Sequence, residues 1–156
     1  MANTHRHLLG DQDYVVDLEI ASATVLEIGD LTCLSSSKAI PVSSVTGGDA
    51  ATRQAAAAAA FAGVSRSASA NGDTDNVDID TGGLVKMAIT SGTYKAGQMV
   101  AVADSGTALK DQEVVVTAYA ARAIGVIWRN MTAAGTEVWV RIFSRTFGPL
   151  ALDLDT

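Results

Sequence analysis

Histidine and cysteine, on which much catalytic and metal chemistry depends, are nearly absent from this sequence of 156 residues. Its two histidines, His5 and His7, lie within the first seven positions, which excludes a catalytic histidine in the body of the chain. A His-X-His pair without a third ligand does not predict a metal site. The single cysteine, Cys33, cannot form an internal disulfide, and its apolar neighbours in "LTCL" predict a small buried side chain.

Clustered positive charge and long apolar runs are also lacking. The formal net charge is −6 and the basic residues are dispersed, which argues against a nucleic-acid partner and against an anionic membrane surface. No apolar run approaches the roughly 20 residues that cross a bilayer. The stretch "MANTHRHLLGDQD" at the N-terminus has no apolar h-region, so we expect no secretory signal and synthesis in a reducing cytosol.

Motifs of catalysis and of cofactor or metal binding are not found either. The stretch "GVSRS" (63–67) lacks the second glycine of a nucleophile elbow, and "VTGGDAATR" (45–53) lacks the lysine of a phosphate-binding loop. A calcium loop counted from Asp73 fails at its fifth position, where Val77 stands. We therefore expect Asp78 and Asp80 to face solvent from a strand, and we expect no cofactor and no metal. A cation at Asp73, Asp75, Asp78 and Asp80 stays an open alternative.

What the sequence does contain is a series of short alternating strands. They begin with "DYVVDLEI" (13–20) and with two short strands in "TVLEIGDLTCL" (24–34), where Gly29-Asp30 is the turn or bulge. They continue from Phe61 to "EVWVRIF" (137–143), with turn residues between them. Many short strands and 14 glycines predict an all-β fold, a small barrel or sandwich. The stretch "SSSKAIPVSSVTGGD" (35–49) is predicted to be mostly loop, and Pro41 restricts any strand in it to a sheet edge. One Ala-rich helix is predicted after the N-cap residue Asp49, with Gly63 as its end unless tertiary pairing draws the end of the alanine run into the following strand.

The strand patterns occur twice, at offsets between 61 and 68 residues. In each copy a glycine precedes an alternating strand, a Gly-Val pair begins a second strand, and a Val-X-hydrophobic strand closes the unit. The matching pairs are "IGDLTCL" at Ile28 with "AGQMVAV" at Ala96, Gly63 with Gly125, and "VDI" at Val77 with "VWV" at Val138. We therefore predict one domain over 13–143 with degenerate repeats, about 24–80 and 93–142, that pair into a single barrel-like body.

The segments outside that domain, an N-terminal arm (1–12) and a C-terminal tail (144–156), carry apolar residues that need a cover. On the last strand, alternation places Trp139 on the polar face shared with Glu137 and Arg141, where an aromatic side chain is a candidate for an interface. The predicted interface residues are Leu8, Leu9, Tyr14, Trp139, Phe147 and Leu150.

Several of these stretches resemble the small head-decoration, or cement, proteins of tailed bacteriophages. The resemblance covers roughly residues 20–143 and rests on "FAGVS", "GGLVKMAI", "AGQMVAV", "AIGVIW" and "GTEVWVRI". It implies a non-enzymatic protein, made in the host cytoplasm, that trimerises and binds the major capsid protein on the outer surface of the virion. The alternative is a carbohydrate- or surface-binding β module of a phage tail or adhesion structure, with Trp128 or Trp139 as a stacking platform. A small hydrolase is the weakest alternative, because the body of the chain has no histidine.

Overall fold

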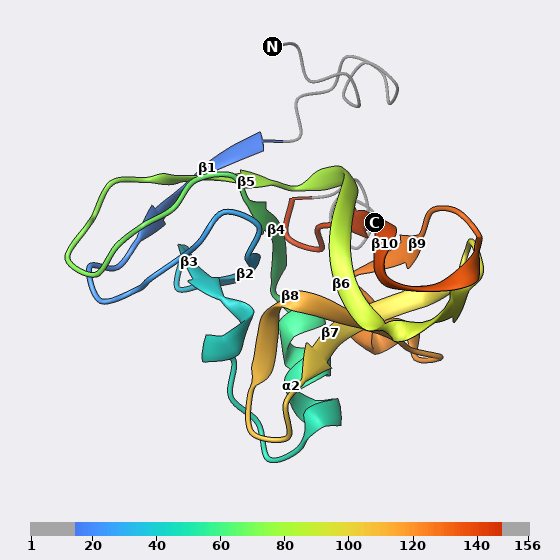
Figure 1. Cartoon of the computed structure of the whole chain (residues 1–156). Helices are drawn as coiled ribbons and strands as arrows, with labels where there is room; N and C mark the ends of the chain where they lie inside the picture. Colours follow the sequence, from blue (N-terminus) through green and yellow to red (C-terminus); the bar gives the residue numbers. More distant parts are fainter. Residues whose placement is uncertain (1–14, 148–156) are drawn as a thin grey trace, which may run out of the picture.

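Two closed five-stranded barrels form the part of the chain that the computed structural model describes, residues 15–147. The first barrel has the strand order β1–β3–β2–β4–β5 and the second β6–β8–β7–β9–β10 (Figure 1). The strands are β1 (Val15–Ile20), β2 (Leu31–Ser35), β3 (Lys38–Pro41), β4 (Phe61–Ser65), β5 (Val77–Asp80), β6 (Gly82–Tyr94), β7 (Met99–Asp104), β8 (Leu109–Val116), β9 (Gly125–Ile127) and β10 (Met131–Phe143). The helices are η1 (Val42–Ser44), α2 (Ala50–Ala59) and η2 (Ala120–Arg122).

The two barrels have the same topology. In each, the first and third strands pair in parallel, with Glu19 opposite Lys38 in one and Ala88 opposite Glu113 in the other. All other neighbouring strands are antiparallel. The predicted all-β fold with one helix and an internal repeat is confirmed. The expectation of a single barrel is corrected, because each copy closes its own sheet.

The repeat extends to individual hydrogen bonds. The N–H of Gly29 donates to the carbonyl of Ser65 at 2.8 Å, and the N–H of Gly97 donates to the carbonyl of Ile127 at the same distance. These are the glycines that the repeated motif placed before β2 and β7. Each bond ties the turn that precedes the second strand of its barrel to the end of the fourth strand.

A close approach between backbones explains the glycine of each Gly-Val pair. A Cβ added to Gly63 would meet the carbonyl group of Asp80, and one added to Gly125 would meet the carbonyl group of Arg141. These contacts join the fourth and fifth strands of each barrel, at equivalent positions. The two glycines therefore allow each barrel to close.

Strand β3 lies where the sequence predicted mainly a loop, and Pro41 does not restrict it to an edge. Residues Ser36 and Ser37 have φ angles of 48° and 65° and form the two-residue turn between β2 and β3. Turns of this kind usually carry Asn-Gly, so two serines give little warning of a hairpin. β3 then pairs with β2 on one side and β1 on the other, and Pro41 is its last residue.

The Ala-rich helix is confirmed as α2. Asp49 caps it by accepting a hydrogen bond from the N–H of Thr52 at 2.7 Å, and this bond holds the pKa of the Asp49 carboxyl below its usual value. The predicted end at Gly63 is wrong: α2 ends at Ala59, and β4 begins at Phe61. The alanine run stays helical to Ala59, whereas Phe61 and Gly63 pair with β2, so tertiary pairing ends the helix before the glycine. Within residues 15–147, no helix is long and apolar enough to span a bilayer.

The larger apolar cluster of the described chain belongs to both barrels. Phe61, fully buried at the start of β4, belongs to one cluster with Val100 of β7 and Val140 of β10. The helix contributes Ala57 and Ala58 to this cluster. A smaller cluster, within the first barrel, contains Leu18, Ile20, Leu26, Ala39, Ala62, Val77 and Ile79. The shared cluster packs the two barrels into one body.

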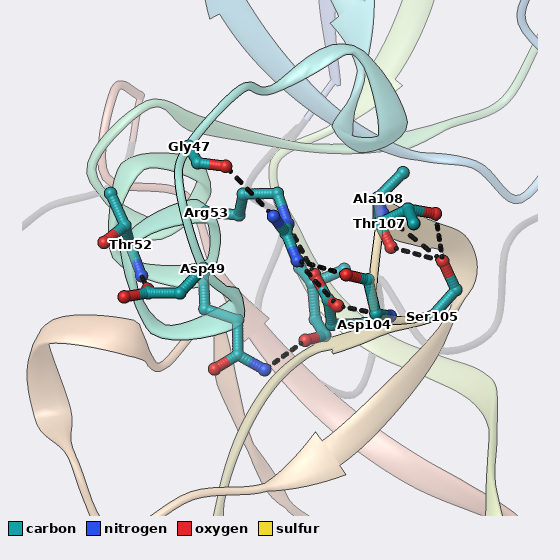
Figure 2. A network of polar contacts seen from close by, with 11 residues as sticks. Gly47, Asp49, Thr52, Arg53, Asp104, Ser105, Thr107 and Ala108 are labelled. Carbon is teal, nitrogen blue, oxygen red and sulfur yellow. Dashed lines mark hydrogen bonds and ion pairs between the residues drawn. The ribbon is translucent and has the colours of Figure 1, made fainter.

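A buried ion pair lies at this junction. Arg53 of α2 donates to both carboxylate oxygens of Asp104 at the end of β7, at 2.7 Å and 2.9 Å, and both side chains are 7% exposed. Figure 2 shows the guanidinium between this carboxylate and the carbonyl of Gly47, to which it also donates. The hydrogen bond from Arg53 lowers the pKa of Asp104, and the same bond raises the pKa of Arg53. Two-point contact fixes α2 on β7 in a defined orientation.

Further polar contacts join the two copies. The carbonyl of Phe61 accepts hydrogen bonds from the backbone N–H of Arg145 and from the hydroxyls of Ser144 and Thr146, at 3.1 to 3.2 Å. Elsewhere Ser43 donates to the Asp111 carboxylate through its N–H and its hydroxyl, each at 2.8 Å. The first copy is therefore fixed to the second at several separate points.

We predict that Gly63→Ala and Gly125→Ala each lower the free energy of unfolding by at least about 3 kcal/mol, because the added methyl overlaps backbone that cannot move without opening a barrel. Gly48→Ala is the matched control: a Cβ there meets nothing within 4 Å, so we expect a change within about 0.5 kcal/mol. Urea unfolding followed by circular dichroism measures all three. Equal losses in the three variants would contradict the role of the two close approaches.

The ion pair predicts a pH-dependent contribution to stability. The pKa of Asp104 is lowered by folding, so its contribution is present above its unfolded value of about 3.9 and is lost as pH falls through the folded value. Asp104→Asn should therefore unfold at a lower temperature than wild type at pH 7. The difference between the two melting temperatures should become smaller below about pH 4. The double variant Arg53→Met/Asp104→Leu is the control, with a smaller loss at pH 7 than Asp104→Asn alone. A gap that stays constant from pH 7 to the acid limit would contradict this prediction.

Candidate interaction surfaces

Of the predicted interface residues, the structure describes two. Trp139 lies on β10, and Phe147, 39% exposed, lies beyond the end of β10 with its N–H bonded to the hydroxyl of Ser144 at 3.0 Å. The predicted interface residues outside the described part of the chain are Leu8, Leu9, Tyr14 and Leu150. Their role as contact residues stays a prediction.

One outer face of the second barrel gathers aromatic side chains around an arginine. On β10, Val138, Val140 and Ile142 are buried, and the alternating residues point outward. Trp139 is half-buried on this outer side, so the predicted facing of its side chain is confirmed. We call the outward group of Trp128, Trp139, Arg141 and Phe143 the aromatic–arginine face. Glu137 lies on the same side of β10, where it forms an ion pair with Lys86 at 2.8 Å.

Arg141 lies between two rings of this face. Its guanidinium carbon is 5.8 Å from the ring centroid of Trp128 and 5.8 Å from that of Phe143. Trp128 follows β9, and its N–H donates to the carbonyl of Trp139 at 2.8 Å, which fixes the backbone of the residue beside β10. The side chains remain accessible, with Trp128 45% and Phe143 39% exposed. A flat cationic and aromatic surface of this kind is typical of interface centres.

A second surface is the loop 21–30 that joins β1 to β2. Val25 is 51% exposed and Ile28 is 67% exposed, although the loop is well anchored. Between them Leu26 is buried and exchanges two backbone hydrogen bonds with Ser69, at 3.0 Å and 2.9 Å. At its end the Asp30 carboxylate accepts a hydrogen bond from the Gln112 side chain of β8 at 2.8 Å. The loop therefore presents two aliphatic side chains from a fixed backbone.

A third surface, near η2, carries an exposed aromatic residue. The ring of Tyr119 is 60% exposed, and the guanidinium of Arg122 stands 4.2 Å from its centroid. Arg145 also reaches this region and donates to the carbonyl of Ala120 at 2.6 Å. This corner is basic and aromatic, like the aromatic–arginine face.

The acidic stretch adopts the strand that its alternation predicted. On β5, Val77 and Ile79 are buried and Asp78 is exposed. Asp80 forms an ion pair with Arg66 at 3.6 Å. In the part of the chain that the structure covers, no group of three or more His, Cys, Asp or Glu side chains is arranged to hold a metal ion.

Cys33 is the small buried side chain that its neighbours predicted. It is fully buried on β2, and its thiol donates to the carbonyl of Ala57 at 3.3 Å. Burial raises the pKa of the thiol to about 12, so the thiolate that would act as a nucleophile is not formed near neutral pH.

The residues that sequence reasoning missed have different signals. Phe143 was missed, although it follows Trp139 and Arg141 at a spacing of two, so the alternation that placed those two side chains on one face extends to it. Alternation predicts a strand at Val25 and Ile28, whereas both lie in the loop between β1 and β2, and no sequence pattern marks them as exposed. Tyr119 lies between β8 and η2 in a segment without periodicity.

No protein-family model and no curated protein sequence matches this chain.

Proposed function

We propose that the protein is a structural, non-enzymatic subunit that attaches to the outer surface of an assembled phage head and stabilises the shell. The observation that carries this proposal is loop 21–30, which presents Val25 and Ile28 to solvent from an anchored backbone. Exposed aliphatic side chains on a fixed loop are suited to contact a protein surface, because the loop has little further order to lose on binding.

The size of the contact fits a decoration protein that binds many equivalent sites. Full burial of one aliphatic side chain is worth about 1.5–3 kcal/mol, so burial of Val25 and Ile28 supplies part of the binding free energy of a complex of moderate affinity. A ligand that binds only the assembled lattice stabilises that lattice by mass action. The gain is about 2.7 kcal/mol at a free concentration one hundredfold above Kd.

The family resemblance supports the same proposal at the level of the fold. Its motif stretches lie on β4, β6, β7, β9 and β10, which are strands of the two barrels. A resemblance of strand patterns is an argument by analogy, and the function itself depends on surfaces. The major capsid protein is accordingly the proposed partner, and the capsid surface of the virion the proposed location.

A second candidate function is binding of a carbohydrate surface, and the exposed ring of Trp128 favours it. Indole rings are common stacking partners for sugars, but here the Arg141 guanidinium lies near one face of this ring. Glycan-array binding that depends on Trp128, together with failure to bind capsids, would select this alternative.

We predict that Val25→Asp/Ile28→Asp weakens attachment to capsid shells at least tenfold, a loss of about 1.4 kcal/mol, because two charged groups replace the aliphatic contact. The measurement is co-sedimentation with shells assembled from the major capsid protein of the phage that encodes this chain. Val115→Asp is the matched control, since Val115 is an exposed aliphatic residue on β8, outside the loop. Wild-type protein that does not bind the shells would overturn the proposed function, and a double variant that binds normally would remove loop 21–30 from the contact.

A further inference from the structure

The two barrels share one topology but carry opposite net charge. Residues 15–80 contain nine Asp or Glu against three Lys or Arg, a formal net charge of −6. Residues 82–147 contain four Asp or Glu against seven Lys or Arg, a formal net charge of +3. The overall acidity of the chain therefore hides one acidic barrel and one basic barrel.

The difference is sharpest at positions that the repeat makes equivalent. In the first barrel Val64 of β4 lies opposite Asp80 of β5, and in the second Val126 of β9 lies opposite Arg141 of β10. Asp80 and Arg141 are thus counterparts with opposite charge. Their neighbours differ accordingly, because Asp80 pairs with Arg66 whereas Arg141 packs beside Trp128.

On the next pair of strands the charge is reversed at one of the two positions. Asp17 of β1 lies opposite Asp78 of β5, and both side chains are exposed. At the equivalent position of the second barrel, Lys86 of β6 lies opposite Trp139 of β10. We call the outward side of β1 and β5, with Asp17, Asp78 and Asp80, the acidic face. It is the counterpart of the aromatic–arginine face.

We propose that the aromatic–arginine face of one protein molecule docks on the acidic face of a second molecule, so that the chains associate head to tail. Arg141 then meets carboxylates, and the exposed rings of Trp128 and Phe143 lose their contact with water. Complementary charge at the rim of an aromatic centre favours association and selects the orientation.

Within a single protein molecule the aromatic–arginine face cannot contact the acidic face. Figure 1 shows β1 and β9 on opposite sides of the molecule, and the junction at Arg53 and Asp104 holds the barrels in place. The contact joins two different surfaces, so it repeats from copy to copy, and cyclic closure gives a ring. The contact between these two faces would hold the homo-oligomer together, and the biological role of that oligomer rests on the proposed capsid function.

Sedimentation velocity without any capsid tests the contact, at concentrations from roughly 1 to 200 µM and at low and high salt. We expect wild-type protein to associate as concentration rises, and to associate more weakly at high salt, where charges are screened. R141E and D17K/D78K should each weaken association at least tenfold. An equimolar mixture of these two variants should associate again, because each altered face then meets its altered partner.

Two controls keep the outcome specific. K110E changes the net charge as R141E does, but Lys110 lies on β8 beside Glu113, so association should be unchanged. A chain that ends at Phe147 should also associate like wild type. Circular dichroism and urea unfolding verify that every variant is folded.

The proposal would be overturned by wild-type protein that stays monomeric throughout, by a mixture of variants that fails to associate, or by K110E that behaves as R141E does. Loss of association in the chain ending at Phe147 would instead assign the face to residues 148–156, and would equally contradict docking between barrels. Capsid co-sedimentation of R141E separates this inference from the proposed function, because a monomeric variant that still binds shells leaves the function intact.

Discussion

The apolar cluster that the two barrels share, with the ion pair between Arg53 and Asp104 at its edge, is the constraint on which the rest of the structure depends. Each barrel alone would leave part of this cluster in water, including the fully buried ring of Phe61. A bidentate ion pair adds orientation to the nondirectional gain from burial. The outer faces therefore keep fixed positions relative to one another, which is what a subunit with several contact surfaces requires.

The repeat explains how one chain carries two different surfaces on the same scaffold. The glycines at 63 and 125 and the turns at 29 and 97 maintain barrel geometry in both copies, so the outward side chains are free to differ. The first repeat carries η1 and α2 between its third and fourth strands, and the second has only the short η2 there. Divergence of the outward residues produced an acidic barrel and a basic, aromatic barrel from one β unit.

Local signals were enough to predict most of the strands, the start of the helix and the repeat. Alternation gave the facing of Trp139 and Asp78, and the capping residue Asp49 gave the start of α2. Closure of two barrels was not predictable in the same way, because β3 follows a turn of two serines and pairs in parallel with a strand distant in sequence. The contact of Arg141 with Trp128 joins two separate strands, so only the fold brings the aromatic–arginine face together.

Differential scanning calorimetry tests most directly whether the shared cluster joins the barrels into one body. A single transition is expected, with a ratio of calorimetric to van't Hoff enthalpy near one, because unfolding either barrel exposes the apolar surface of the other. Two resolved transitions, or a ratio well above one, would show barrels that unfold independently. That result would contradict the account, since the two faces would then have no fixed arrangement.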